Sequence, residues 1–153
     1  MIPDPHPRRG INMLVADLMT SQPVTVSMDA TVSQVRDLFH NRRFHHLIVV
    51  EHDQVVGVIS DRDLLSALSP FIGKRDERAA DERLLHRHAH QIMSRDPICV
   101  TPTSLVEDAA ALLLAHKISC LPVVDEARRP VGIITWRDLI SWSLARLAQS
   151  RAA

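Results

Sequence analysis

The chain contains the stretch Val56-Gly57-Val58-Ile59-Ser60-Asp61-Arg62-Asp63-Leu64 and repeats its pattern as Val131-Gly132-Ile133-Ile134-Thr135-Trp136-Arg137-Asp138-Leu139. Each copy is an apolar run that ends in a hydroxyl residue, and an aspartate follows three residues later. Duplicated units usually bury their apolar faces against each other and place equivalent polar groups around a pseudo-twofold axis. The sequence therefore predicts two similar halves that share one core.

The repetition continues upstream, where matching residues are separated by one residue fewer than the two stretches quoted above. The matched positions there are Met19, Pro23, Val26 and Val32 in the first copy, with Met93, Pro97, Val100 and Val106 in the second. A one-residue difference in length between the copies, downstream of Glu51 and upstream of Val56, accounts for the change.

Each copy predicts the same order of elements: strand, helix, strand, strand, helix. A short extended stretch leads to a helix start that resembles a capping box, Thr31…Gln34 in one copy and Ser104…Glu107 in the other. Two apolar runs with turn residues between them then predict paired strands. These runs are 47–50 and 55–59 in the first copy, and 121–124 and 131–134 in the second. Final helices begin near Asp61 and Trp136.

The predicted fold class is α+β (α/β), with two tandem β-α-β-β-α repeats packed sheet to sheet around a pseudo-twofold axis. The expected division is a flexible arm over 1–14, a first repeat over 15–68, a charged and His-rich linker over 69–91, a second repeat over 92–147 and a tail over 148–153. Part of the linker, 81–91, is expected to form a solvated helix. In the last helix, the candidate buried positions are Leu139, Ile140, Trp142, Leu144 and Leu147.

Composition excludes some classes of function. Lys plus Arg (18) equals Asp plus Glu (18), which gives no sustained positive field for nucleic acid. The longest apolar run, 109–115, is too short to cross a bilayer, and the first residues lack the apolar region of a signal peptide. We therefore expect a cytoplasmic protein without membrane or nucleic-acid partners. Cys99 and Cys120 are expected to be reduced, with a disulfide left open.

The two copies resemble the CBS domain family, and together they resemble a tandem CBS pair (a Bateman module). The resemblance covers about residues 15 to 143 and includes the Met-then-Pro pattern, Leu121-Pro122-Val123-Val124-Asp125 and both Gly-apolar-apolar-Ser/Thr-x-x-Asp endings. It implies a stand-alone regulatory module that binds an adenine nucleotide such as AMP, ADP or ATP. It also implies a flat homodimer formed through helices, and a regulated partner protein.

The Ser/Thr-x-x-Asp endings have a chemical rationale as binding elements. A hydroxyl residue at a helix start lies among free N–H groups that attract phosphate, and an aspartate one turn later faces the same side. Its carboxylate can accept hydrogen bonds from both ribose hydroxyls. The alternative is a helix cap with nothing bound, because the same motif is common at helix starts.

The resemblance implies two clefts, each built from both repeats. One would join Val58, Ser60 and Asp63 to Thr101, Ile118 and Ser119, and the other would join Ile133, Thr135 and Asp138 to Ser27, Phe44 and His45. Arg62 and Arg137 are candidate phosphate contacts or solvated surface residues. His45-His46 replaces the Ser119-Cys120 of the second copy, so the first cleft is the stronger candidate. The imidazoles could stack on a base, contact phosphate or crowd the pocket.

The sequence is also compatible with other interpretations of its function. An interaction or dimerisation module with empty clefts fits the same pattern, and S-adenosylmethionine or NAD are alternative ligands. The nine histidines suggest a metal site, but no Cys-x-x-Cys or His-Glu-x-x-His is present and no third ligand is fixed. We expect no metal, and we expect His86, His88 and His90 to be solvated; a metal- or pH-responsive module acting through the histidines is a further alternative. No nucleophile–base pair is indicated, so neither catalysis nor a catalytic cofactor is predicted.

Overall fold

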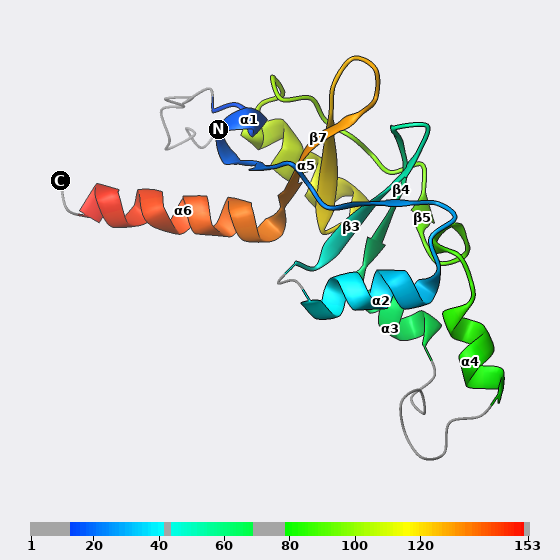
Figure 1. Ribbon diagram of the computed structural model, residues 1–153. Coiled ribbons are helices and arrows are strands. Elements are labelled where there is room, and N and C mark those ends of the chain that lie inside the picture. The colour runs from blue at the N-terminus through cyan, green and yellow to red at the C-terminus, as the bar shows by residue number, and fades with distance from the viewer. Residues whose placement is uncertain (1–12, 42–43, 69–78, 152–153) are drawn as a thin grey trace.

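The computed structural model describes residues 13–41, 44–68 and 79–151 (Figure 1). Most of the predicted arm and the first part of the predicted linker lie outside these ranges. In chain order, the elements of the first half are α1 (Val15–Leu18), β1 (Thr20–Ser21), β2 (Thr25–Ser27), α2 (Val32–Asn41), β3 (His46–Glu51), β4 (Gln54–Ser60) and α3 (Asp61–Ala67). The elements that follow are α4 (Ala79–Leu85), a short 3-10 helix η1 (Ala89–Gln91), β5 (Ser94–Arg95), α5 (Val106–His116), β6 (Cys120–Val124), β7 (Pro130–Thr135) and α6 (Trp136–Arg151).

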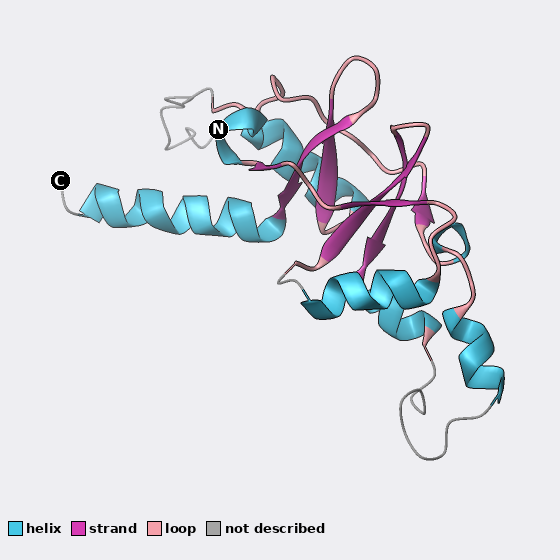
Figure 2. Ribbon diagram, in the orientation of Figure 1, coloured by secondary structure: helices cyan, strands magenta, loops and turns pink. Residues whose placement is uncertain are grey.

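The strands form two sheets that lie in the middle of the molecule, with helices outside them (Figure 2). One sheet has the order β2-β3-β4-β5, and the other has the order β1-β7-β6. A parallel bridge between Val100 and Val123 places the segment before α5 beside β6, as β2 lies beside β3. The two sheets are therefore equivalent, and the predicted fold class is confirmed.

One apolar cluster joins the two sheets. Ile48 and Val58 from the first sheet pack with Cys120 and Ile133 from the second, and all four side chains are less than a tenth exposed. Removing this apolar surface from water favours the face-to-face packing of the sheets. The sheet-to-sheet arrangement that the sequence predicts is present.

The helix starts differ between the copies. Thr31 caps α2: the Gln34 N–H donates to Thr31 Oγ1 (3.2 Å), and the Thr31 N–H donates to Gln34 Oε1 (2.9 Å). The predicted box at Ser104 is wrong, because α5 begins after Leu105, which has no side-chain cap bond. Ser104 Oγ instead accepts the N–H of Thr101 (3.1 Å) and closes the preceding turn.

The two repeats exchange their first segments. Val15 of α1 is fully buried in the core of the second repeat, and β1 pairs with β7. Ala89 of η1 is fully buried in the core of the first repeat, and β5 pairs with β4. Each sheet is therefore completed by a short strand from the other half of the chain. β1, which precedes the helix and hairpin of the first repeat, joins the second sheet, and β5, which precedes those of the second repeat, joins the first sheet.

The His-rich segment is ordered against the first repeat. The helix there is α4, which ends at Leu85, and the predicted solvated helix over 81–91 is interrupted by a turn before η1. His86 is exposed, but His88 and His90 are partly buried, and their Nδ1 atoms lie 2.7 Å from Asp29 O and 3.0 Å from Met28 O. The expectation of solvent exposure is therefore wrong for His88 and His90, because they anchor η1 to the loop before α2.

Helix α6 extends away from the rest of the molecule (Figure 1). Leu139 is buried and Trp142 is partly buried, as predicted. Ile140, Leu144 and Leu147 are 54%, 61% and 59% exposed, so the prediction that they are buried is wrong for this chain. They share one side of a helix that continues beyond the end of the core and reaches Arg151, inside the predicted tail.

Candidate functional site

Two cavities lie where the repeats meet. The first, here called cleft A, has a volume of about 560 Å³ and contains Ser60 and Asp63. Its other lining residues are His46, Val58, Arg62, Ser94, Arg95, Asp96, Pro97, Ile98, Lys117, Ile118, Ser119, Cys120 and Trp136. Its walls therefore come from both repeats.

The second cavity, cleft B, is its counterpart around Thr135 and Asp138. It has a volume of about 630 Å³. The remaining lining residues are Thr20, Gln22, Pro23, Val24, Phe44, His45, His46, Ser119, Ile133, Trp136 and Arg137. Both volumes fall within the usual range for small-molecule sites.

In both clefts, the aspartate of the repeated hydroxyl–aspartate pair accepts the same two hydrogen bonds. Asp63 Oδ2 accepts the backbone N–H (2.8 Å) and the hydroxyl (2.7 Å) of Ser60, and the Asp63 N–H donates back to Ser60 Oγ (3.1 Å). Asp138 Oδ2 accepts the N–H (2.7 Å) and the hydroxyl (2.8 Å) of Thr135. Each aspartate therefore caps its helix through one oxygen, which fixes the carboxylate at the cleft wall.

The structure brings most of the predicted site residues together. Cleft A contains Val58, Ser60, Arg62, Asp63, Ile118 and Ser119, and cleft B contains Phe44, His45, Ile133, Thr135, Arg137 and Asp138. Of the site residues predicted from the sequence, Ser27 and Thr101 line neither cleft.

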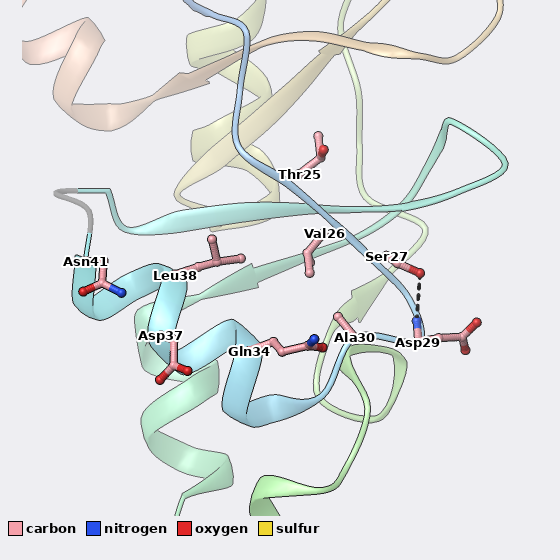
Figure 3. A pocket seen from close by; sticks show the side chains of 9 residues that line it. All are labelled: Thr25, Val26, Ser27, Asp29, Ala30, Gln34, Asp37, Leu38 and Asn41. Carbon is pink, nitrogen blue, oxygen red and sulfur yellow. Dashed lines mark hydrogen bonds between the residues drawn. The ribbon is translucent and has the colours of Figure 1, made fainter.

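The direction of the first strands explains this difference. β2 runs parallel to β3, so Ser27 lies opposite Val50, whereas the clefts lie at the other end of β3, where His46 pairs with Ser60. Ser27 belongs to a separate pocket between β2 and α2, where its hydroxyl accepts the N–H of Asp29 at 3.2 Å (Figure 3). Thr101 likewise turns back, and its hydroxyl lies 3.1 Å from Ser104 Oγ.

The clefts use the start of each first strand and the segment before it. Ser94 to Ile98 line cleft A, and Thr20 with Gln22 to Val24 line cleft B. Gln22 and Asp96 both have positive φ values, 53° and 47°, so the chain turns sharply at matching points. Sequence reasoning did not assign these residues to the clefts, although the repeated methionines before both segments and the repeated prolines within them marked the positions.

Cleft A contains several charged side chains. Arg62, Arg95 and Lys117 line it together with Asp63 and Asp96. Arg95 also donates through Nη2 to the carbonyl oxygen of His90 (2.9 Å), which restrains its guanidinium. Three cations around two carboxylates suit a ligand that carries both phosphate and hydroxyl groups.

The two adjacent histidines have separate partners. His45 Nδ1 lies 2.8 Å from Asp61 Oδ2, and this hydrogen bond lowers the pKa of Asp61. His46 Nε2 lies 2.8 Å from Ser119 Oγ in the other repeat. Burial lowers the pKa of His46, although the nearby carboxylates of Asp61 and Asp63 oppose the effect. His46 is therefore favoured in its neutral form.

The described ranges contain no group of three His, Cys, Asp or Glu side chains arranged to hold a metal ion. Within the same ranges, no helix has both the length and the apolar character needed to span a bilayer.

The sequence of the chain is similar to those of known proteins. A sequence model of the CBS domain matches residues 15–70 and again residues 89–145. A CBS domain-containing protein of Dictyostelium discoideum is 32% identical over 132 residues, which cover 85% of this chain and 90% of that protein. Several other curated relatives are matched over less than half of their length, and two of these are an L-aspartate semialdehyde sulfurtransferase and an inosine-5'-monophosphate dehydrogenase of Methanocaldococcus jannaschii.

Solved structures agree with the sequence matches. The structure of CBSX2 (a protein of Arabidopsis thaliana) in complex with AMP is 28% identical, has a TM-score of 0.71 and covers 86% of this chain and 96% of that one. The CBS domain pair of protein MJ0100, in complex with 5'-methylthioadenosine and S-adenosyl-L-methionine, is 25% identical with a TM-score of 0.70. That match covers 85% of this chain and 98% of that one. The chain belongs to the CBS domain family and carries two CBS domains in tandem.

Proposed function

We propose that this chain is a regulatory module that binds an adenine nucleotide (AMP, ADP or ATP) in the clefts between its CBS domains and passes the change to a partner protein. The observation that carries the proposal is the pair of clefts, each with a fixed hydroxyl–aspartate pair from one repeat and walls from the other. The related CBSX2 in complex with AMP supports the choice of ligand.

Cleft A offers a specific mode of binding. Asp63 uses Oδ2 for its helix cap, and Oδ1 has no hydrogen-bond partner among the described residues. This oxygen can accept the ribose hydroxyls, while Arg62, Arg95 and Lys117 lie within the same cavity as candidate phosphate contacts. Val58 and Ile118 supply apolar surface for the faces of the base, as the family resemblance implies.

The proposed activity is binding without catalysis, and no catalytic cofactor is proposed. Asp63 lines only cleft A and Asp138 lines only cleft B, so the two carboxylates do not form one acid–base pair. The ligand is an intracellular metabolite and both cysteines are free thiols, so we place the protein in the cytoplasm.

Calorimetric titration with AMP, ADP and ATP tests the proposal. We expect saturable binding that Asp63→Ala weakens at least tenfold in cleft A, because hydrogen bonds to a charged group contribute roughly 1.5–3 kcal/mol each. Glu107→Ala removes the same charge from an exposed position on α5 outside both clefts, and should leave binding unchanged. Absence of binding to all three nucleotides at millimolar concentration would favour a module with empty clefts.

The same titration separates the alternative ligands. S-adenosylmethionine and 5'-methylthioadenosine occupy the related MJ0100 pair, and neither contains a phosphate group. If a phosphate-bearing ligand is correct, Arg62→Ala with Arg95→Ala should weaken ATP strongly and should leave 5'-methylthioadenosine almost unaffected. An equal loss for both ligands, or tight binding of S-adenosylmethionine alone, would contradict an adenine nucleotide. NAD is tested in the same series.

We propose that a second copy of the chain binds to the exposed faces of the outer helices. Large apolar side chains are exposed on three helices, and they are Leu65 on α3, Leu114 on α5, and Ile140, Leu144 and Leu147 on α6. Exposed apolar surface of this kind marks contact sites in soluble proteins. The family resemblance implies that the contact joins two modules through these helices.

A further inference from the structure

The two clefts share part of their lining. His46, Ser119 and Trp136 are in contact with both cavities. We call these three residues the shared wall. His46 lies at the start of β3 in the first repeat, whereas Ser119 and Trp136 belong to the second repeat, where they precede β6 and begin α6. Both cavities are therefore bounded by the same three residues.

Hydrogen bonds hold the shared wall together. His46 Nε2 lies 2.8 Å from Ser119 Oγ. The Trp136 indole N–H donates to Ile118 O at 2.9 Å, and the Trp136 backbone N–H donates to Ser119 O at 3.3 Å. A displacement of Ser119 toward one cleft therefore also affects the position of Trp136, which follows the Thr135 of cleft B directly in the chain.

The polar pair in the wall has limited hydrogen-bonding capacity. Burial favours the neutral form of His46, which has one N–H and one lone pair on its ring, and Ser119 has a single hydroxyl hydrogen. Where the hydroxyl hydrogen turns toward a ligand in one cleft, it no longer serves the histidine or the other cleft. Neighbouring groups in one hydrogen-bond network commonly couple in this way.

We propose that occupancy of one cleft weakens ligand binding in the other through His46, Ser119 and Trp136. The proposal rests on the proposed nucleotide function and adds its regulation: the module responds over a wider range of ligand concentration than two independent sites would. Because the coupling is a difference in binding free energy, it is reciprocal, so filling cleft B also weakens cleft A.

The experiment measures the dissociation constant of AMP for cleft B with cleft A empty and with cleft A filled. Asp63→Ala gives the dissociation constant of cleft B with cleft A empty. The second binding step of the unsubstituted protein gives the dissociation constant of cleft B with cleft A filled. We expect the filled-to-empty ratio to be at least about fivefold, the lower end of typical allosteric coupling. Asp138→Ala reports the reciprocal ratio for cleft A.

The same ratio is then measured with Ser119→Ala, which removes the shared hydroxyl and leaves both aspartates in place. We expect the filled-to-empty ratio of this variant to lie within twofold of one. Thr103→Ala removes an exposed hydroxyl outside both clefts and should leave the ratio at its original value.

Each possible outcome bears on the proposal. A ratio near one in the unsubstituted protein, a ratio that Ser119→Ala leaves unchanged, or loss of all binding in Asp63→Ala or in Asp138→Ala would overturn the coupling while nucleotide binding stands. Failure of the unsubstituted protein to bind any adenine nucleotide would overturn the proposed function, and the coupling with it.

Discussion

Met19 lies so close to Gly132 that a Cβ atom on the glycine would collide with the methionine sulfur. The same relationship joins Met93 to Gly57. The repeated methionine and the repeated glycine are therefore two sides of one contact, and each contact joins a segment of one repeat to a strand of the other. The glycine is required for close approach, since the Thr20 carbonyl oxygen would also lie 3.1 Å from the added carbon.

Gly132→Ala should therefore destabilise the protein. We expect a loss of about 1–3 kcal/mol in the free energy of unfolding, the usual result of overpacking a filled site. Urea denaturation measures the effect. Met19→Ala removes the colliding side chain, so the double variant should lose less stability than the sum of the two single variants. A change below about 0.5 kcal/mol in Gly132→Ala alone would contradict the contact.

The cap at Ser60 should serve both stability and binding. Ser60→Ala and Thr31→Ala each remove a helix-capping hydroxyl, so each should cost about 1 kcal/mol of stability. Only Ser60 lines a cleft. Calorimetric titration with AMP should therefore show weaker binding for Ser60→Ala and unchanged binding for Thr31→Ala. Equal binding by the two variants would mean that the hydroxyl acts only as a cap.

Burial of His46 should make stability depend on pH. Because the folded protein holds the pKa of His46 below 6.5, the unfolded chain takes up this proton at a higher pH than the folded chain does. The contribution is fully present above about pH 6.5 and is lost as the pH falls toward the folded pKa. In urea denaturation at pH 7.5 and 5.5, His46→Gln should show a smaller loss of stability on acidification than the unsubstituted protein.

The matched control for this titration is His86→Gln, which changes an exposed histidine on the segment after α4. Its loss of stability between the two pH values should equal that of the unsubstituted protein. If His46→Gln and His86→Gln lose stability equally, burial of His46 does not control the pH dependence.

The exposed apolar side of α6 should control assembly. Leu144→Glu places a charge among Ile140 and Leu147, so we expect sedimentation equilibrium to show a shift from dimer to monomer. Ser141→Glu adds the same charge at an exposed position outside this apolar stripe and should leave the dimer intact. A monomeric unsubstituted protein, or a dimer that Leu144→Glu leaves unchanged, would assign the surface to another partner.

Much of the fold could be predicted because its signals are local. The hairpin strands, the cap at Thr31 and the starts of α3 and α6 depend on residues a few positions apart, and the duplication provided each signal twice. The central pair of each cleft could be predicted for the same reason, since Ser60 with Asp63 and Thr135 with Asp138 are separated by one helical turn.

The remaining features depend on long-range geometry. Nothing local to Ser27 or Thr101 indicates which end of the neighbouring strand faces the clefts. Helical spacing also cannot distinguish a side chain buried in its own core from one on an outer surface, which is why Leu144 and Leu147 were predicted to be buried.

The exchange of first segments has a consequence for how the protein unfolds. Val15 completes the second core and Ala89 completes the first, so neither half retains a full core without the other. Both tryptophans, Trp136 and Trp142, lie in the second repeat. If Val35→Ala weakens the first core, tryptophan fluorescence and far-UV circular dichroism should shift to the same lower midpoint. Separate unfolding midpoints would show two independent folding units. A common midpoint means that the duplicated chain unfolds as a single cooperative unit.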